Sequence, residues 1–192
     1  MPNSVLTVGH SNQTLEEFKS LLRQHSVTAV ANIRTKPYSA YAQWFNQEII
    51  KAELEHSGIT YVYLGTELGN QPTDAACYKN GKVSYELMAQ TALFKKGLQR
   101  IIEGSKKFSL AIMCVEKEPL ECHRSVLHAR ELQALGCSVS HILEDGRLET
   151  HEETMSRLLK QFGFGEGDLF RTREQLIEEA CARQEQKVAY KT

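Results

Sequence analysis

The chain has 192 residues, of which 41% are hydrophobic and 24% are charged, and its formal net charge at pH 7 is −1. These values are ordinary for a single soluble globular domain, and a nearly neutral chain has no overall field that would attract long nucleic acid or an acidic membrane. No run approaches the ~20 apolar residues of a membrane span, and the start lacks a signal-peptide pattern. The five cysteines are scattered singly. We therefore expect a cytoplasmic protein without a disulfide framework.

Apolar runs alternate with helical patterns along the chain. The apolar runs predict strands at 5–8, 27–33, 59–64, 110–115 and 139–143. The helical patterns predict a helix after the capping box at Thr14 and Glu17, and further helices at 45–56, 83–103, 122–135, 148–162 and 169–189. The run at 110–115 is the most continuous and predicts a central strand. A polar stretch at 66–82 has no periodicity, which favours a lid or a mobile loop.

Strands separated by helices favour right-handed βαβ units and a parallel sheet. We therefore expect the α/β class, with a mostly parallel sheet of about five strands, helices on both faces in a Rossmann-like three-layer sandwich, and extra C-terminal helices. Residues 1–165 would form this domain, and residues 166–192 a C-terminal amphipathic helix and tail. That helix can pack on the domain or on a second copy, so a homodimer stays open.

Reactive side chains fall where the predicted strands end and where one predicted helix begins. They are His10, Ser11, Arg34, Cys114, Glu116, Cys122, His123 and Arg124. In a parallel sheet these positions gather at one edge, outside the carboxyl ends of the strands, which is where ligands bind in such folds. The sequence thus predicts one polar site drawn from distant segments.

The residue types at this edge suit an anion and acid–base chemistry. A helix N-terminus with His123 and Arg124 attracts anions, and Arg34 can supply a second guanidinium for a phosphate or carboxylate. The helix dipole would lower the pKa of a Cys122 thiol, which would make it a nucleophile. Glu116 can serve as an acid or a base, or orient an arginine.

Structural roles compete with each of these functions. Cys114 lies in an apolar run and suits an inert core position. Arg124 can pair with one of three nearby carboxylates, those of Glu116, Glu118 and Glu121. No arginine stands six positions after either thiol, as the cysteine phosphatases require, and no glycine-rich phosphate loop occurs. An anion site and a purely structural pair both stay open.

A metal site is disfavoured, and we expect no metal and no cofactor. The chain has no Cys-x-x-Cys spacing, and adjacent Cys122 and His123 cannot easily face one ion from a helix start. His141 suggests a surface or packing residue, and His151 a solvated one. The aromatic residues Tyr38, Tyr41, Trp44 and Phe45 suggest core packing, with a stacking wall for a planar ligand as the alternative.

Several short motifs resemble the family catalogued as domain of unknown function 488. They are Gly9-His10-Ser11 with Phe18, Arg34 and Pro37 before Phe45-Asn46, Leu68-Gly69, Cys114-x-Glu116, and Pro119-x-x-Cys122-His123-Arg124. The resemblance runs from about Val5 to Leu158 and implies an α/β fold with a shared pocket at these motifs, but no settled reaction. Two positions depart from the family: Asn32 stands where an aspartate is common, and Asn70 where a glycine or a basic residue is usual.

These observations favour an enzyme, a hydrolase or group transferase, acting on a phosphate-bearing small molecule, nucleotide or nucleic-acid component. Its catalytic residues would be His10, Glu116, Cys122 and His123, and its substrate-binding residues Ser11, Asn32, Arg34, Cys114 and Arg124. The alternative is a non-catalytic module that binds an anionic ligand or nucleic acid. Asn32 slightly favours the module, because an asparagine cannot act as a base.

Overall fold

A single six-stranded sheet organises the protein in the computed structural model, which describes residues 3–165 and 170–192. The strand order is β3-β2-β6-β1-β7-β8. Five strands are parallel and β8, at one edge, runs antiparallel to β7. The strands are β1 Ser4–Gly9, β2 Ala29–Asn32, β3 Thr60–Tyr63, β6 Leu110–Cys114, β7 Ser138–Ile142 and β8 Leu148–Thr150. The predicted α/β class with a mostly parallel sheet is confirmed.

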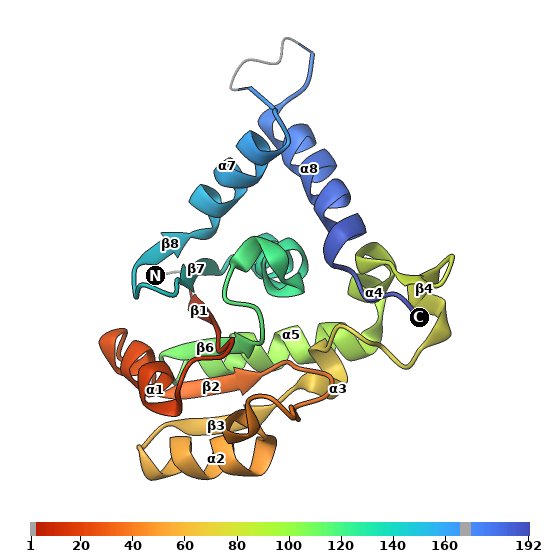
Figure 1. Cartoon of the computed structure of the whole chain (residues 1–192). Coiled ribbons are helices and arrows are strands. Elements are labelled where there is room, and N and C mark those ends of the chain that lie inside the picture. The colour runs from red at the N-terminus through yellow and green to blue at the C-terminus, as the bar shows by residue number, and fades with distance from the viewer. Residues whose placement is uncertain (1–2, 166–169) are drawn as a thin grey trace.

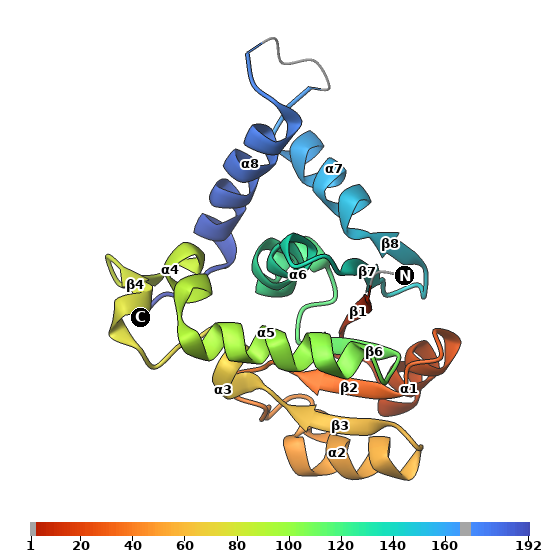
Figure 2. The same cartoon turned by 180° about the vertical axis from the view of Figure 1, so that it is seen from behind.

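Helices cover both faces of the sheet (Figures 1 and 2). On one face, α1 Leu15–Gln24 and α2 Gln47–His56 pack on β2, β3 and β6 through one apolar cluster. On the other face, α5 Ala92–Ser105 and the elements that follow β6 pack through a second and larger cluster. All five residues of β6 are buried. The most continuous apolar run is therefore the central strand, as predicted.

Capping boxes start two of the helices, and the one predicted at Thr14 and Glu17 is confirmed. Thr14 accepts a hydrogen bond from the backbone of Glu17, and the Glu17 carboxylate accepts one in return, which closes the capping box of α1. The same arrangement of Thr150 with Glu153 starts α7 His151–Gln161. Local capping thus sets the start of both helices.

Three predicted helices are interrupted. The 83–103 pattern splits into α4 Tyr85–Gln90 and α5, because Thr91 leaves the helical conformation and caps α5. The 148–162 pattern begins as strand β8 before α7. The 45–56 pattern is a 3₁₀ turn, η1 Gln43–Phe45, followed by α2.

The segment predicted as one helix from 122 to 135 differs most. A 3₁₀ turn, η3 Pro119–Glu121, comes first, Cys122 is extended, and a π-helical stretch, η4 Arg124–Ala129, leads into α6 Arg130–Ala134. Every residue of the π-helical stretch is buried. π-helical turns are rare and frequently mark functional sites, so this departure bears on the site described below.

The polar stretch at 66–82 is largely structured. It contains α3 Gly65–Leu68, the turn η2 Ala75–Cys77, and the start of the hairpin β4 Tyr78–Lys79 with β5 Lys82–Val83. The C-terminus ties this hairpin down, since the Thr192 N–H donates to the Gly81 carbonyl. The stretch therefore contains regular structure that its sequence did not indicate.

The C-terminal helix α8 Arg173–Val188 packs on the rest of the protein. Its apolar residues belong to the same core cluster as the sheet, and Gln184 donates a hydrogen bond of 2.6 Å to the Leu120 carbonyl. The helix was predicted from residue 169, which lies with 166–168 outside the described residues, as does the predicted domain boundary at 166. The sequence left open whether this helix packs on the domain or on a second copy, and in the structure it packs on the domain.

Within residues 3–165 and 170–192, no helix has the length and apolar character needed to cross a membrane.

Candidate functional site

The polar residues predicted to gather do lie together, at the carboxyl ends of β1, β2 and β6. Since β6 lies between β1 and β2, the residues that follow each strand are neighbours. The His10 backbone N–H donates to the Cys114 carbonyl at 3.1 Å, and that of Ser11 donates to the Val115 carbonyl at 2.7 Å. The sheet therefore continues as hydrogen-bonded loops and sets these segments side by side.

Gly9 allows this close approach. A Cβ atom at this position would lie 1.8 Å from the carbonyl oxygen of Glu116 and 2.9 Å from Cα of Lys117. Two residues later, Ser11 takes a left-handed conformation, with φ of 45°, which is unusual for a residue other than glycine. The end of β1 is thus shaped tightly around the turn that carries Glu116.

Arg34 is buried among neutral groups. Its Nε donates to Asn32 Oδ1 at 3.1 Å, its Nη1 lies 3.1 Å from His10 Nε2, and its Nη2 donates to the Phe45 carbonyl at 2.6 Å. Burial lowers the pKa of this guanidinium, an effect that Tyr61 partly offsets. Among the described residues, no carboxylate forms an ion pair with Arg34.

His10 is held in one tautomer by its two contacts. Its Nδ1 donates to the Ser11 carbonyl at 2.8 Å, so its Nε2 accepts from Arg34. Burial, together with the charge of Arg34, lowers the pKa of His10 to about 3. The ring also stacks on Phe45, with centroids 4.1 Å apart. His10 is therefore neutral and positions Arg34, which leaves neither ring nitrogen free for acid–base catalysis.

Asn32 connects Arg34 to β3. Its side-chain oxygen accepts from both the backbone N–H and the Nε of Arg34, and its Nδ2 donates to the Tyr61 hydroxyl at 2.8 Å. All of these partners are satisfied without a negative charge. The asparagine thus fixes the guanidinium but leaves its charge unbalanced.

Arg124 has a different environment from the one predicted. It is fully buried, and its guanidinium donates to the backbone carbonyls of Glu116 and Lys117 and to the Thr7 hydroxyl. These contacts use Nε and both terminal nitrogens, and none of the three candidate carboxylates pairs with it among the described residues. Neither predicted role, holding a ligand or pairing with a carboxylate, matches these contacts. Arg124 instead fixes the turn that carries Glu116.

Two thiols, an imidazole and a carboxylate form a compact cluster beside Arg34. The Nδ1 of His123 lies 3.5 Å from the Cys122 sulfur and 3.8 Å from the Cys114 sulfur. Glu116 Oε2 lies 3.3 Å from the Cys114 sulfur. Both cysteines and His123 are buried, whereas Glu116 is half-buried. Four of the predicted site residues are thus in mutual contact.

The cluster shifts the pKa values of its members. Burial opposes ionisation of Cys122, but the hydrogen bond from Cys114 and the charges of His123 and Arg124 hold its pKa well below the ordinary value. The pKa of Cys114 is raised well above its ordinary value, first by its hydrogen bond to Cys122 and then by burial. Burial and the Cys122 sulfur raise the pKa of Glu116 to about 6. One thiolate is therefore stabilised and the second thiol is kept protonated.

The local backbone explains how adjacent residues face one point. Cys122 is extended, with φ of −130° and ψ of 143°, and His123 is helical, with φ of −59° and ψ of −21°. A change of conformation between neighbours turns both side chains toward Cys114. The sequence suggested that Cys122 and His123 could not both face one ion from a helix start. This objection does not apply, because Cys122 is not helical.

Tyr85 is a site residue that the sequence did not reveal. It is 4% exposed, and its hydroxyl has no hydrogen-bond partner among the residues that the structure describes. Burial raises the pKa of Tyr85, as do the nearby sulfur of Cys122 and the carboxylate of Glu185. Within the same residues, the buried Nε2 of His123 also has no partner. No motif marks Tyr85, because it opens a short helix far from the other site residues in sequence.

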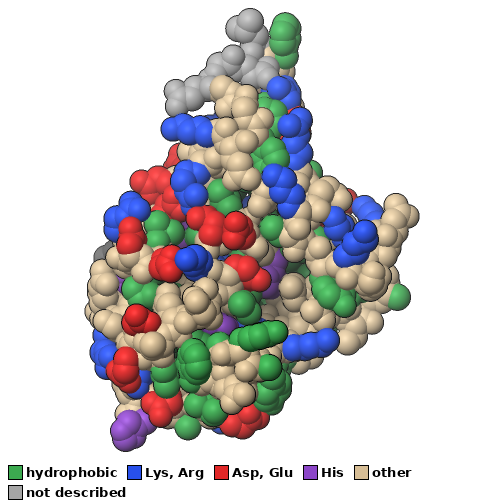
Figure 3. All heavy atoms as spheres, in the orientation of Figure 1, with side chains coloured by type: hydrophobic (Ala, Val, Ile, Leu, Met, Phe, Trp, Pro, Cys, Tyr) green, Lys and Arg blue, Asp and Glu red, His purple; other side chains and the backbone are tan. Residues whose placement is uncertain are grey.

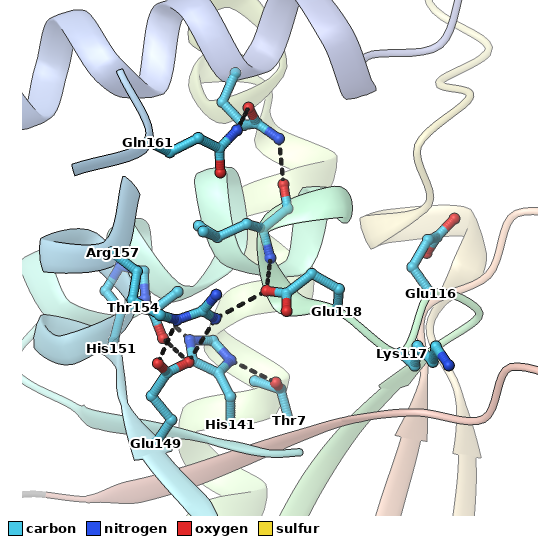
Figure 4. A network of polar contacts seen from close by, with 12 residues as sticks. Thr7, Glu116, Lys117, Glu118, His141, Glu149, His151, Thr154, Arg157 and Gln161 are labelled. Atoms are coloured by element: carbon cyan, nitrogen blue, oxygen red, sulfur yellow. Dashed lines mark hydrogen bonds and ion pairs between the residues drawn. The ribbon is translucent and has the colours of Figure 1, made fainter. Parts of the chain in front are cut away.

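A second polar network runs behind the site, on the side of β7 and α7 (Figure 4). The Thr7 hydroxyl, which also accepts from Arg124, lies 2.7 Å from His141 Nδ1, and His141 Nε2 lies 3.1 Å from His151 Nδ1. Both histidines are at most 1% exposed, so the prediction of a solvated His151 is wrong. Glu116 stands apart from this network in Figure 4.

The surface over the site is mixed in character. In Figure 3, partly covered histidine side chains lie in the middle of the face, below a group of acidic side chains and above hydrophobic ones. Of the predicted aromatic cluster, only Phe45 is in the core, while Tyr38, Trp44 and Tyr41 are 57%, 37% and 95% exposed. Core packing therefore explains one of these four residues.

The comparisons with known proteins identify a family. No curated protein and no solved structure matches the chain. The family model described as "Domain of unknown function DUF488" matches residues 14–130, which is more than half of the chain and less than the range of the motif resemblance. The matched range includes Arg34 and the thiol cluster, whereas His10 precedes it. The chain belongs to the DUF488 family.

Proposed function

We propose that the protein is an enzyme, a hydrolase or group transferase, that acts on a phosphate-bearing small molecule, nucleotide or nucleic-acid component. The substrate would bind at the carboxyl ends of β1, β2 and β6, between Ser11, Arg34 and Glu116. Ser11 and Glu116 are half-buried and border the buried residues, so a ligand in contact with them reaches solvent on one side.

The observation that carries this proposal is the charge of Arg34. The side chain is 4% exposed and all of its hydrogen-bond partners are neutral. A buried charge without a counter-charge is costly, and a guanidinium has five N–H groups, of which these contacts require three. An anionic ligand would supply the missing charge and accept the remaining hydrogen atoms of the two terminal nitrogens.

The remaining residues divide into those that can react and those that position others. Glu116 is the candidate acid or base, because it is the carboxylate of the cluster and is half-buried. His10 and Asn32 orient Arg34, and Arg124 holds the turn of Glu116. Cys122 was a candidate nucleophile, and its burial together with Cys114 and His123 favours a supporting role for the thiols.

Turnover on a panel of nucleotides, phosphate monoesters and phosphodiesters tests the proposal. We expect turnover of at least one member by the wild-type chain, and a fall of at least 100-fold in Glu116→Gln with substrate affinity retained. Glu144→Gln, which alters an exposed carboxylate that pairs with Lys117, serves as the control and should keep full activity.

The alternative is a binding module that holds an anion without turnover. Asn32 favours it, because this residue cannot act as a base and its amide already bonds to Tyr61 and Arg34. Phosphate binding that depends on Arg34, with no turnover of any panel member, would support the module. Absence of both binding and turnover would contradict both functions.

A further inference from the structure

We propose that Cys114, Cys122 and His123 bind a thiophilic divalent metal ion, with Zn²⁺ as the best match. The ligand atoms of these three buried residues all lie within 4.8 Å of one another. The inference goes beyond the proposed function and does not depend on it, because it rests on the spacing of sulfur and nitrogen atoms and not on Arg34.

The distances from His123 to the two sulfur atoms are close to those of a tetrahedral site. With Zn–S bonds of about 2.3 Å and Zn–N bonds of about 2.0 Å, tetrahedral angles place sulfur and nitrogen ligands about 3.5 Å apart and two sulfur ligands about 3.8 Å apart. The His123 Nδ1 lies 3.5 Å from the Cys122 sulfur and 3.8 Å from the Cys114 sulfur. An ion between the three atoms therefore needs little movement of the side chains.

The side of the cluster toward solvent suits a fourth ligand. Glu116 Oε2 lies 3.3 Å from the Cys114 sulfur, near the separation of about 3.6 Å expected for sulfur and oxygen on one tetrahedral Zn²⁺. A site with three protein ligands keeps this position for a carboxylate or for water, and a bound water there is acidified by the metal. Such water would lie beside the anion that Arg34 is proposed to hold.

Charge also favours the ion. Binding displaces the protons of the thiols, and two thiolates neutralise a divalent cation. Without a metal, two thiols and a carboxylate are packed together in a buried place, which is an unfavourable arrangement for more than one negative charge. Neighbouring groups hold the ligands in place: the rings of His123 and His128 pack edge to face, with centroids 4.9 Å apart, and Arg124 fixes the loop between the two cysteines.

Titration of the reduced, metal-free full chain with Co²⁺ and then Zn²⁺ tests the proposal. We expect one Co²⁺ per chain with sulfur-to-cobalt charge-transfer absorbance, and displacement of that ion by Zn²⁺. Cys114→Ser and Cys122→Ser should each weaken Co²⁺ affinity more than 100-fold. This loss exceeds the roughly 10–100-fold loss of affinity that is typical when a residue that only orients a ligand is removed. Cys137→Ser changes another buried cysteine outside the cluster and should bind as the wild type does.

A second measurement guards against variants that fail to fold. Alkylation of the wild-type chain with and without Zn²⁺, followed by peptide mapping, should show protection of Cys114 and Cys122 and no protection of Cys137. Asn32→Asp, which changes a partner of Arg34 and Tyr61 and none of the three proposed ligands, should bind Co²⁺ normally, so failure of the anion site would not mimic failure of the metal site. Absence of stoichiometric binding, or binding that survives both serine variants, would overturn the proposal.

Discussion

At the scale of single residues, the site is defined by the way in which Arg34 is buried. A guanidinium in the protein interior is normally paired with a carboxylate, and here Asn32, His10 and a backbone carbonyl take that place. Each neighbour satisfies a hydrogen bond, and none of them neutralises the charge. Arg124 also has only neutral hydrogen-bond partners, but it lies near the Cys122 thiol, whose pKa it helps to lower, and a thiolate there would balance its charge. For Arg34, the proposed ligand would supply the missing charge.

The variant Asn32→Asp tests this difference. An aspartate would pair with Arg34 at the position of the present hydrogen bond and neutralise its charge, so we expect the affinity for inorganic phosphate to fall at least tenfold. The free energy of unfolding should hold or increase, because a buried charge gains a partner. Calorimetric titration with phosphate and urea unfolding measure the two effects.

Asn80→Asp is the matched control, since Asn80 lies exposed in the β4–β5 hairpin. It should leave phosphate affinity unchanged. Equal affinity in Asn32→Asp and the wild type would show that phosphate does not bind at Arg34.

The buried hydroxyl of Tyr85 gives a second test at this scale. Because it has no hydrogen-bond partner in the described part of the chain, its removal in Tyr85→Phe should leave the free energy of unfolding unchanged or raise it. If the hydroxyl serves a ligand, turnover should fall about tenfold. Tyr78→Phe is the control, because the Tyr78 hydroxyl donates to the Pro72 carbonyl at 2.9 Å and its loss should cost about 1 kcal/mol. A destabilised Tyr85→Phe with full activity would contradict this assignment.

At the scale of elements, the segment between β6 and α6 carries most of the chemistry. It leaves the sheet at Cys114, turns at Glu116, and returns through a 3₁₀ turn and a π-helical stretch to α6. Arg124 closes it by donating to two carbonyls of the same segment. The segment is thus a closed loop that brings the thiol of Cys122 next to that of Cys114.

Much of the sheet could be predicted from the sequence, but this segment could not. An apolar run such as Leu110–Cys114 is short and lies between helical patterns, so residues close in sequence are enough to predict a buried strand. The change from an extended Cys122 to a helical His123 depends on contacts with Thr7, Cys114 and the backbone of Glu116, which are distant in sequence. For the same reason, the sequence predicted at which edge of the sheet the thiols lie. It indicated neither the distances within the cluster nor the hydrogen bonds that hold Arg124 against the backbone.

Gly9→Ala tests how tightly this element is fitted. The added Cβ would overlap the Glu116 carbonyl, so the turn must move away from β1, and we expect a loss of about 2–4 kcal/mol in the free energy of unfolding. Gly165→Ala adds a Cβ with no atom of the described residues within 4 Å and should change it by less than about 0.5 kcal/mol. Urea unfolding of both variants is the measurement. Equal stability of the two would mean that the turn is not held against β1.

At the scale of the whole molecule, buried polar groups gather in two places. One is the candidate site at the ends of β1, β2 and β6, and the other is the histidine pair between β7 and α7 (Figure 4). The helix α8 covers the segment between them through Gln184 and its apolar face. The fold therefore stabilises the site from behind with groups that must stay uncharged.

The histidine pair should make the protein sensitive to acid. Burial and the charge of Arg130 lower the pKa of His151 to about 4, an effect that Glu149 partly opposes, and burial followed by the charges of His151 and Arg124 holds the pKa of His141 well below its usual range. Between about pH 6.5 and about pH 4 the unfolded chain therefore binds more protons than the folded one, so stability is complete above this window and falls as the pH decreases through it.

The contribution of His151 alone is roughly 3 kcal/mol over that window. Urea unfolding at about pH 7 and about pH 5 should show a large loss in the wild type and a smaller loss in His151→Gln. The exposed His56 is the control, and His56→Gln should lose as much stability as the wild type. An equal loss in all three proteins would place the acid sensitivity elsewhere.

The central claim, that the carboxyl ends of β1, β2 and β6 bind an anion through Arg34, is tested most directly by a crystal structure of the protein soaked in inorganic phosphate. We predict tetrahedral density within hydrogen-bond distance of the two terminal nitrogens of Arg34, bordered by Ser11 and Glu116. Phosphate found only at other basic side chains, with the contacts of Arg34 to Asn32 and His10 unchanged and no density beside it, would contradict the claim.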